Sequence, residues 1–94
     1  MFEINYEFQA KLDIEKIEFY IKYFLLNSKV ADQIANGISN QILNLKNFPY
    51  IGKCYLDNQN RYLIYKNFYI FYEIQENNKI INIKRILHKN NVVF

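Results

Sequence analysis

Apolar and polar positions alternate most clearly in the last third of the chain, where the pattern predicts three consecutive antiparallel strands. Aromatic and β-branched residues, which suit a pleated and half-buried surface, dominate this stretch. In the middle strand both faces carry apolar side chains, with Tyr69 and Phe71 on the second face, so we expect a central strand covered on both sides. The polar residues 76–78 suit a tight turn. The predicted strands cover roughly 61–66, 68–75 and 79–88.

A further strand and a helix are predicted near the N-terminus. Residues 2–8 alternate between apolar and polar side chains, as expected of a strand. Asp13 is the expected N-cap of a helix, because its carboxylate can accept hydrogen bonds from the free backbone N–H groups of a first turn. Apolar residues then recur at helical spacing from Ile14 to Leu25, which predicts an amphipathic helix.

A second helix is predicted from Val30 to Leu45, where apolar residues recur every three or four positions. Asn27-Ser28 can end the first helix and cap the second. The second helix must end before Pro49, because the residue that precedes a proline is pushed out of the helical region. Gly37 inside this helix costs about 1 kcal/mol relative to alanine, so we expect close packing against a neighbour there.

The order of the predicted elements is strand, helix, helix and then three strands. Helices and strands are segregated along the chain rather than alternating, which favours an α+β fold of the form βααβββ. We expect an antiparallel helix hairpin packed on one face of a twisted, mainly antiparallel four-stranded sheet, with the first strand beside the last. The 94 residues are expected to form a single domain over 1–94.

Composition excludes several classes of protein. With 51% hydrophobic and 22% charged residues the chain is globular, and no apolar run approaches the length of about 20 residues that a membrane helix needs. No signal peptide is evident, and a lone Cys54 fits a reducing cytoplasm. One cysteine and one histidine cannot supply a structural zinc site, so we expect no metal and no other cofactor. A net charge of +3 is compatible with RNA, DNA or an acidic protein as partner and selects none of them.

One set of residues from the helices and the C-terminal strands forms a pattern that spans nearly the whole chain. It consists of Asp13-Ile14, Ile17, Tyr20-Ile21, Ala31, Ile34, Ile38, Ile42, Leu45, Pro49, Gly52, Arg61, the block Phe68–Tyr72 and the terminal Arg85–His88. Taken together, these residues resemble the RelE/ParE superfamily of bacterial toxins. The resemblance implies the toxin component of a type II toxin–antitoxin pair, cytoplasmic and held inactive by a co-expressed antitoxin.

The resemblance implies two alternative activities. RelE-like members are ribosome-dependent ribonucleases that cut mRNA with lysines and arginines, whereas ParE-like members bind and poison DNA gyrase without a catalytic group. The lysines that RelE nucleases carry along the second sheet strand are absent from Tyr62–Tyr65, and the basic cluster after the last strand is reduced to Lys89. The block Phe68–Tyr72 and the closing Ile86-Leu87-His88 are closer to the ParE-like branch. ParE-like chains commonly continue with arginines past the histidine, so a member that has lost toxicity and only binds a partner stays an alternative.

Five side chains near the sheet are candidates for binding the target. His88 can titrate near neutral pH, and Arg61 could hold phosphate or a carboxylate with two hydrogen bonds. In the nuclease alternative His88 would act as acid or base, and Arg61 and Arg85 would clamp phosphate. The target-binding candidates are Arg61, Lys66, Arg85, His88 and Lys89.

Each candidate also has a purely structural interpretation. His88 could cap the sheet by bonding backbone, and Arg61 could form a surface ion pair with Glu73 or Glu76. Under regular alternation Arg85 and His88 face opposite sides of their strand. They could converge only through a β-bulge, which the change of pattern at Lys84-Arg85 indicates.

Overall fold

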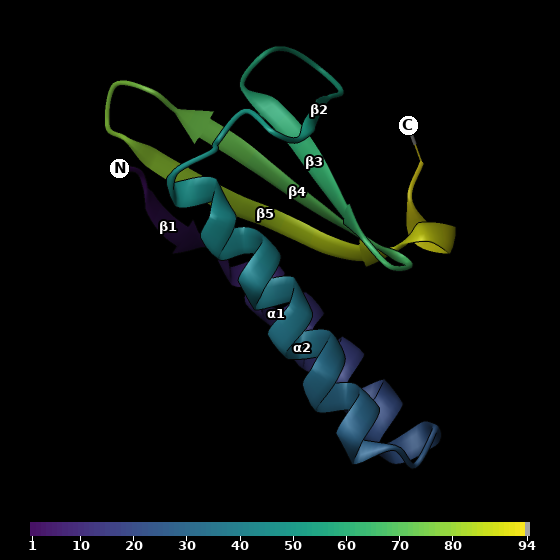
Figure 1. Cartoon of the computed structure of the whole chain (residues 1–94). Helices are drawn as coiled ribbons and strands as arrows, with labels where there is room; N and C mark the ends of the chain where they lie inside the picture. Colours follow the sequence, from purple (N-terminus) through teal and green to yellow (C-terminus); the bar gives the residue numbers. More distant parts are fainter. Residues whose placement is uncertain (94) are drawn as a thin grey trace.

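A pair of antiparallel helices packs against one face of a five-stranded mixed sheet in the computed structural model, which describes residues 1–93 (Figure 1). The strand order is β1-β5-β4-β3-β2. The α+β class and the helix hairpin are therefore as predicted. The elements are β1 (Glu3–Tyr6), α1 (Phe8–Phe19), the π-helical turn η1 (Tyr20–Phe24), α2 (Ser28–Leu43), the 3-10 turn η2 (Asn44–Lys46), β2 (Lys53–Cys54), β3 (Asn60–Tyr65), β4 (Phe68–Gln75), β5 (Ile80–His88) and the 3-10 turn η3 (Lys89–Asn91).

The sheet has one strand more than the four expected. The extra strand is β2, whose two residues pair with β3 through Lys53 opposite Tyr62 and Cys54 opposite Arg61. The first strand lies beside the last, as predicted, and runs parallel to it from the pair Glu3–Ile80 onward. The sheet is therefore antiparallel except at its β1 edge. No helix within residues 1–93 is long and apolar enough to cross a membrane.

The core lies between the helix pair and the inner face of the three long strands. The outer face of β4 is covered as well, because Phe71 is only 9% exposed and lies under the ring of Tyr55, with 5.2 Å between ring centroids. The prediction of a central strand buried on both faces is confirmed. Burying one such branched or aromatic side chain contributes about 2 kcal/mol. The largest fully buried side chains are Tyr72, Ile38, Ile42, Leu45, Ile70, Ile74, Ile81, Ile83 and Ile86.

Asp13 is not a helix cap, and that prediction is wrong. α1 already begins at Phe8, so Asp13 lies within the helix, where it is 6% exposed and faces β5. Its carboxylate accepts hydrogen bonds from the Nε atom of Arg85 at 2.8 Å, from Nη2 at 3.1 Å and from the backbone N–H of Ile86 at 2.9 Å. β1 has ended at this point, so the carboxylate takes the place of a strand at the edge of β5.

A β-bulge interrupts β5, as the change of pattern predicted. Phe71 pairs with Arg85 and Tyr72 pairs with Ile83, which leaves Lys84 as the extra residue. The side chains of β5 that enter the core are therefore Ile81 and Ile83 before the bulge and Ile86 after it. The Lys84 side chain turns to the start of α1 and forms an ion pair with Glu7 at 3.0 Å. This hydrogen bond raises the pKa of Lys84.

Gly52 lies against a buried tyrosine. The Tyr72 hydroxyl is fully buried, accepts a hydrogen bond from the Gly52 N–H at 3.0 Å and donates one to the Pro49 carbonyl at 2.7 Å. A Cβ atom at Gly52 would lie 2.5 Å from this hydroxyl and 2.7 Å from the carbonyl oxygen of Tyr62. Neither neighbour can retreat easily, because one is buried and the other belongs to β3.

Gly37 allows a side chain of the sheet to reach the backbone of α2. A Cβ atom there would overlap the phenol end of Tyr65, which confirms the close packing expected at this glycine. At the start of the same helix the Asn27 side chain accepts a hydrogen bond from the Val30 N–H at 3.1 Å, so the predicted cap is also confirmed.

The two glycines predict different costs for an added methyl group. We expect Gly52→Ala to lower the free energy of unfolding by about 2–3 kcal/mol, because it overpacks a buried site and displaces the Tyr72 hydrogen bonds. Gly37→Ala should cost less than about 1 kcal/mol, because the Tyr65 ring end can swing outward and the helix gains propensity. Urea unfolding of both variants measures the difference, and equal losses would contradict this account.

The Asp13 contacts predict that removing this charge costs more stability than removing an exposed one. We expect Asp13→Asn to lower the free energy of unfolding by about 2 kcal/mol, because the amide cannot accept from Arg85 and Ile86 as a charged carboxylate does. Asp32→Asn is the matched control, since Asp32 is exposed on α2 and loses the same charge. Its unfolding free energy should change by less than about 0.5 kcal/mol. If both variants lose the same unfolding free energy, Asp13 does not stabilise the edge of β5.

Candidate functional site

Three of the five candidate side chains come together where the β3–β4 turn meets the end of β5. The turn places Lys66 in the left-handed region, with φ of 52°, and Asn67 follows it. The backbone N–H of Lys89 donates to the Asn67 carbonyl at 2.8 Å, which fixes η3 beside the turn (Figure 1). Lys66, His88 and Lys89 therefore occupy one corner of the molecule.

The His88 ring is held by two neighbours. It stands edge-on to Phe68, with 5.6 Å between ring centroids. Its Nδ1 atom accepts a hydrogen bond from the backbone N–H of Asn90 at 3.2 Å, so the ring bonds backbone and begins η3. Because Nδ1 is the acceptor, the neutral ring carries its proton on Nε2 and can donate from that atom.

A groove of about 540 Å³ runs between this corner and the α1–η1 segment. Within residues 1–93, Lys16 and His88 are the only basic side chains that line the groove, and no carboxylate lines it. The groove therefore offers one imidazole, one ammonium and one phenol among apolar and amide walls. The lining residues are Lys16, Ile17, Tyr20, Ile21, Leu25, Asn67, Phe68, His88, Asn90 and Asn91.

Arg61 lies away from this corner and holds a loop. It is four residues before the end of β3, or about 13 Å along the strand at 3.3 Å per residue. Its Nη1 atom donates to the carbonyls of Tyr50 and Gly52, each at 2.9 Å, and Nε donates to the carbonyl of Asn58 at 2.8 Å. Nη2 donates to the side chain of Asn58. The guanidinium thus pins the segment around β2, and its partners are not Glu73 or Glu76.

Arg85 is also engaged in the fold. Its bidentate hydrogen bonds with Asp13 raise the pKa of the guanidinium, although nearly half of the side chain stays exposed. The bulge precedes both Arg85 and His88, so it does not bring them together. Arg85 pairs with Phe71, on the outer face of β4, and His88 pairs with Phe68, on the core side.

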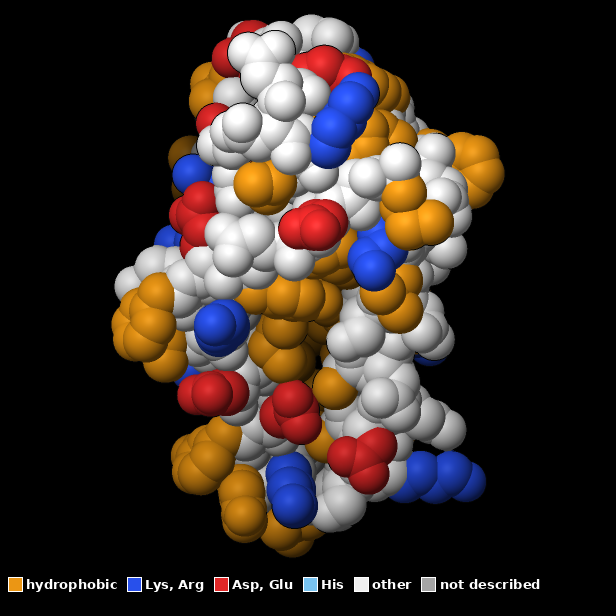
Figure 2. Space-filling view, turned by 90° about the vertical axis from the view of Figure 1, so that its left-hand side faces the viewer, with side chains coloured by type: hydrophobic (Ala, Val, Ile, Leu, Met, Phe, Trp, Pro, Cys, Tyr) orange, Lys and Arg blue, Asp and Glu red, His pale blue; other side chains and the backbone are white. Residues whose placement is uncertain are grey.

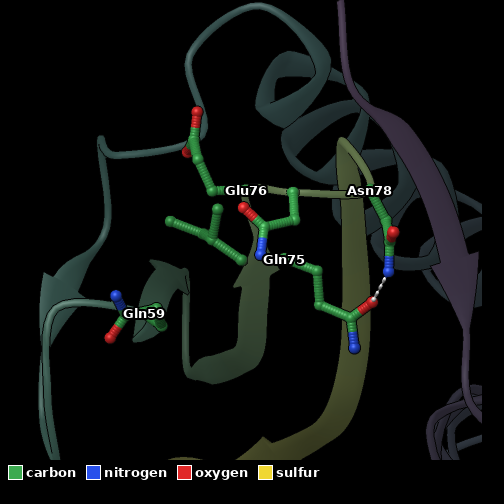
Figure 3. Close-up of a pocket in the computed structure, with 6 residues that line it drawn as sticks. Gln59, Gln75, Glu76 and Asn78 are labelled. Carbon is green, nitrogen blue, oxygen red and sulfur yellow. Dashed lines mark hydrogen bonds between the residues drawn. The ribbon is translucent and has the colours of Figure 1, made fainter.

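A second hollow, of about 370 Å³, lies at the opposite end of the sheet around the β4–β5 turn (Figure 3). Figure 3 shows Gln75 and Asn78 pointing toward each other, and their amides share a 3.4 Å hydrogen bond. Glu76 accepts hydrogen bonds from Tyr50 and Lys79, which lower the pKa of its carboxyl. The hollow offers amide groups and no unpaired charge. Within residues 1–93 no three side chains of metal-ligating type gather to hold an ion.

The groove contains residues that sequence analysis missed. Lys16 and Tyr20 come from the helix, and Asn67 and Asn90 come from segments next to β4 and β5. Only packing of the hairpin against the end of the sheet brings them together, and no local pattern marks them. Leu25 belongs to the predicted apolar stripe of the first helix, and Tyr20 contributes only to the family resemblance, so neither is predicted from sequence to line a groove.

Comparisons with known proteins agree with this geometry. The structure is similar to three solved complexes. It matches a chain of the chromosomal ParDE system from P. aeruginosa with a TM-score of 0.79 at 20% identity, covering 94% of this chain and 96% of that one. It matches the toxin–antitoxin complex RelBE2 from Mycobacterium tuberculosis with a TM-score of 0.70 at 14% identity (93% and 96% covered) and the E. coli RelBE complex with 0.66 at 10% (92% and 94%).

A search by sequence against individually curated proteins finds no match. The family model for the ParE toxin of type II toxin–antitoxin systems, parDE, matches residues 4–93. That match takes in both helices, all five strands and the corner that holds His88. The chain belongs to the ParE toxin family.

Proposed function

We propose that this toxin inhibits bacterial growth by binding its target, DNA gyrase, and not by cutting mRNA. The observation that carries the proposal is the use of both arginines: Arg61 holds the loop around β2, and Arg85 is bound by Asp13. Neither guanidinium lies beside His88. A binding activity needs a suitable surface, whereas a nuclease needs converging groups.

The chemistry of RNA cleavage sets a requirement that these positions do not meet. A nuclease must take a proton from the 2′-hydroxyl, give one to the leaving oxygen and neutralise the phosphate between them. His88 could do one of these tasks. Arg61 is too distant along β3 to share a phosphate with it, and Arg85 lies on the opposite face. This separation supports the binding proposal.

Lys66, His88 and Lys89 form the centre of the proposed contact with the target. The two lysines are exposed, and the Lys66 ammonium lies 5.9 Å from the centroid of the Tyr65 ring. An acidic patch on the partner would be recognised by these cations, and the His88 Nε2 atom adds a directed hydrogen bond. Arg61 and Arg85, the other two candidates, hold the β2 segment and α1 in place and lie outside this centre.

A cognate antitoxin neutralises the toxin in the cytoplasm under this proposal. The three solved complexes reported above are named as toxin–antitoxin systems, which supports an antitoxin partner in a heteromeric assembly. The groove beside His88 has apolar walls from Ile17, Leu25 and Phe68. An antitoxin segment that orders on binding can lay an apolar helix face there and cover the target-binding corner.

Purified toxin and gyrase separate the activities. We expect the wild-type chain to inhibit supercoiling, and Lys66→Glu with Lys89→Glu to weaken inhibition at least tenfold, since two attractive charges become repulsive. Lys53→Glu is the control: it makes the same change on β2, away from the corner, and should retain inhibition. If the paired substitution leaves inhibition unchanged, the corner does not contact gyrase.

Induction in a bacterial host tests the rival activities. Filamentation with intact mRNA supports gyrase as the target. Rapid arrest of translation with codon-phased mRNA cuts, abolished by His88→Ala, would instead identify a ribosome-dependent nuclease. Absence of any growth defect would indicate a toxin-fold protein that only binds a partner.

A further inference from the structure

The far end of the helix hairpin exposes a dense apolar surface, and the proposed function uses only the side of it that faces the groove. The hairpin extends well beyond the sheet, so this end stands clear of the strands (Figure 1). Large apolar side chains here are between 55% and 83% exposed. Contiguous apolar surface of this kind on a small protein marks an interaction site. The residues are Phe19, Tyr20, Tyr23, Phe24, Leu25 and Leu26.

This apolar end has two sides with different surroundings. Tyr20 and Leu25 line the groove beside His88. Phe19 and Tyr23 lie on the other side, with 4.7 Å between their ring centroids, in a shallow hollow of about 240 Å³. We call this second side the outer face, and it is lined by Glu15, Glu18, Phe19, Lys22 and Tyr23.

The π-helical turn joins the two sides of the apolar end. In η1 the backbone N–H of Leu25 donates to the Tyr20 carbonyl at 3.3 Å, a spacing of five residues. The same wide turn brings side chains five apart into register, and Phe24 packs edge-on to Phe19 at 6.4 Å between centroids. A regular α-helix aligns residues three and four apart instead. π-helical turns often occur at functional sites, and in this one Phe24 also stacks on Tyr20 with 5.5 Å between centroids, so it bridges Phe19 of the outer face and Tyr20 of the groove side.

We propose that the outer face binds the outer face of a second copy, with the two α1–η1 helices antiparallel. A two-fold axis midway between Phe19 and Tyr23 sets each Phe19 against the partner's Tyr23. Such an interface is self-complementary, because each contact occurs twice. The face is separate from the groove, so the dimer leaves His88 open.

The charges around the rings favour a second copy over an acidic or basic partner. Glu18 and Lys22 are four residues apart on the same flank of Phe19 and Tyr23. Antiparallel pairing brings Glu18 of each helix next to Lys22 of the other, so two ion pairs form. Figure 2 shows acidic and basic side chains interspersed with apolar ones over the protruding helices, in its lower half.

The area of the outer face is sufficient for a weak dimer. Phe19 and Tyr23 are each more than half exposed, and with the flanking charged stems they form a small interface, of the size found in weak and transient associations. We therefore expect weak association that depends on concentration, to be measured up to about 100 μM.

Charge reversal at the outer face tests this arrangement by sedimentation of the full chain. Glu18→Lys alone and Lys22→Glu alone should each weaken dimerisation at least tenfold, because every substitution acts at two symmetry-related ion pairs. Combining them should restore association to within about threefold of wild type, since the pairs reform with reversed sign. Lys53→Glu, on β2, is the control and should leave the dimer unchanged. Urea unfolding of each variant checks that the fold persists.

Three results would overturn the proposal. The first is a wild-type chain that stays monomeric throughout the concentration range. The second is a dimer that neither single reversal weakens. The third is a combined variant that is no stronger than the single ones, which would exclude antiparallel pairing. Growth inhibition and gyrase assays do not enter this test, so its failure and that of the proposed function are distinguishable.

Discussion

The Asp13 carboxylate joins α1 to β5 at the point where β1 has ended, and the placement of the helix hairpin depends on this junction. Without a strand beside it, the edge of β5 would leave the Ile86 N–H unpaired in a buried place. The carboxylate supplies the acceptor, and Arg85 neutralises the charge that burial would otherwise disfavour. α1 is thereby fixed along β5, and this position sets one wall of the groove beside His88.

The same junction explains which parts of the fold could be predicted from sequence. Periodicity identifies the helices and the long strands, because burial on one face is repeated at every turn or every second residue. The start of α1 could not be found this way, since the helix begins at Phe8 with no side-chain cap. Asp13 resembled a cap, although it shares a helical face with buried Ala10 and with Ile17. The two residues of β2 form a strand only because the segment is pinned to β3 by Arg61.

The site was harder to predict than the fold for a related reason. His88, Lys66 and Lys89 were identified as candidates by type, and their proximity depends on a backbone hydrogen bond between η3 and Asn67. Arg61 and Arg85 are the same type of residue but serve the scaffold, and only their hydrogen-bond partners reveal the difference. The exposed rings of η1 extend a helical stripe beyond the sheet, so periodicity alone assigns them to a core that does not reach them.

The structural use of Arg61 and Arg85 limits which substitutions this chain can accept under a mutational bias. The sequence is rich in lysine and asparagine, as expected of genes poor in G and C, yet lysine does not occupy positions 61 and 85. An ammonium is a point donor on a flexible stem and cannot reach three carbonyl oxygens in a plane, or both oxygens of a carboxylate, as a guanidinium does. A mutational bias against G and C can therefore replace exposed arginines by lysine without structural cost. At positions 61 and 85 the hydrogen-bond geometry requires arginine instead.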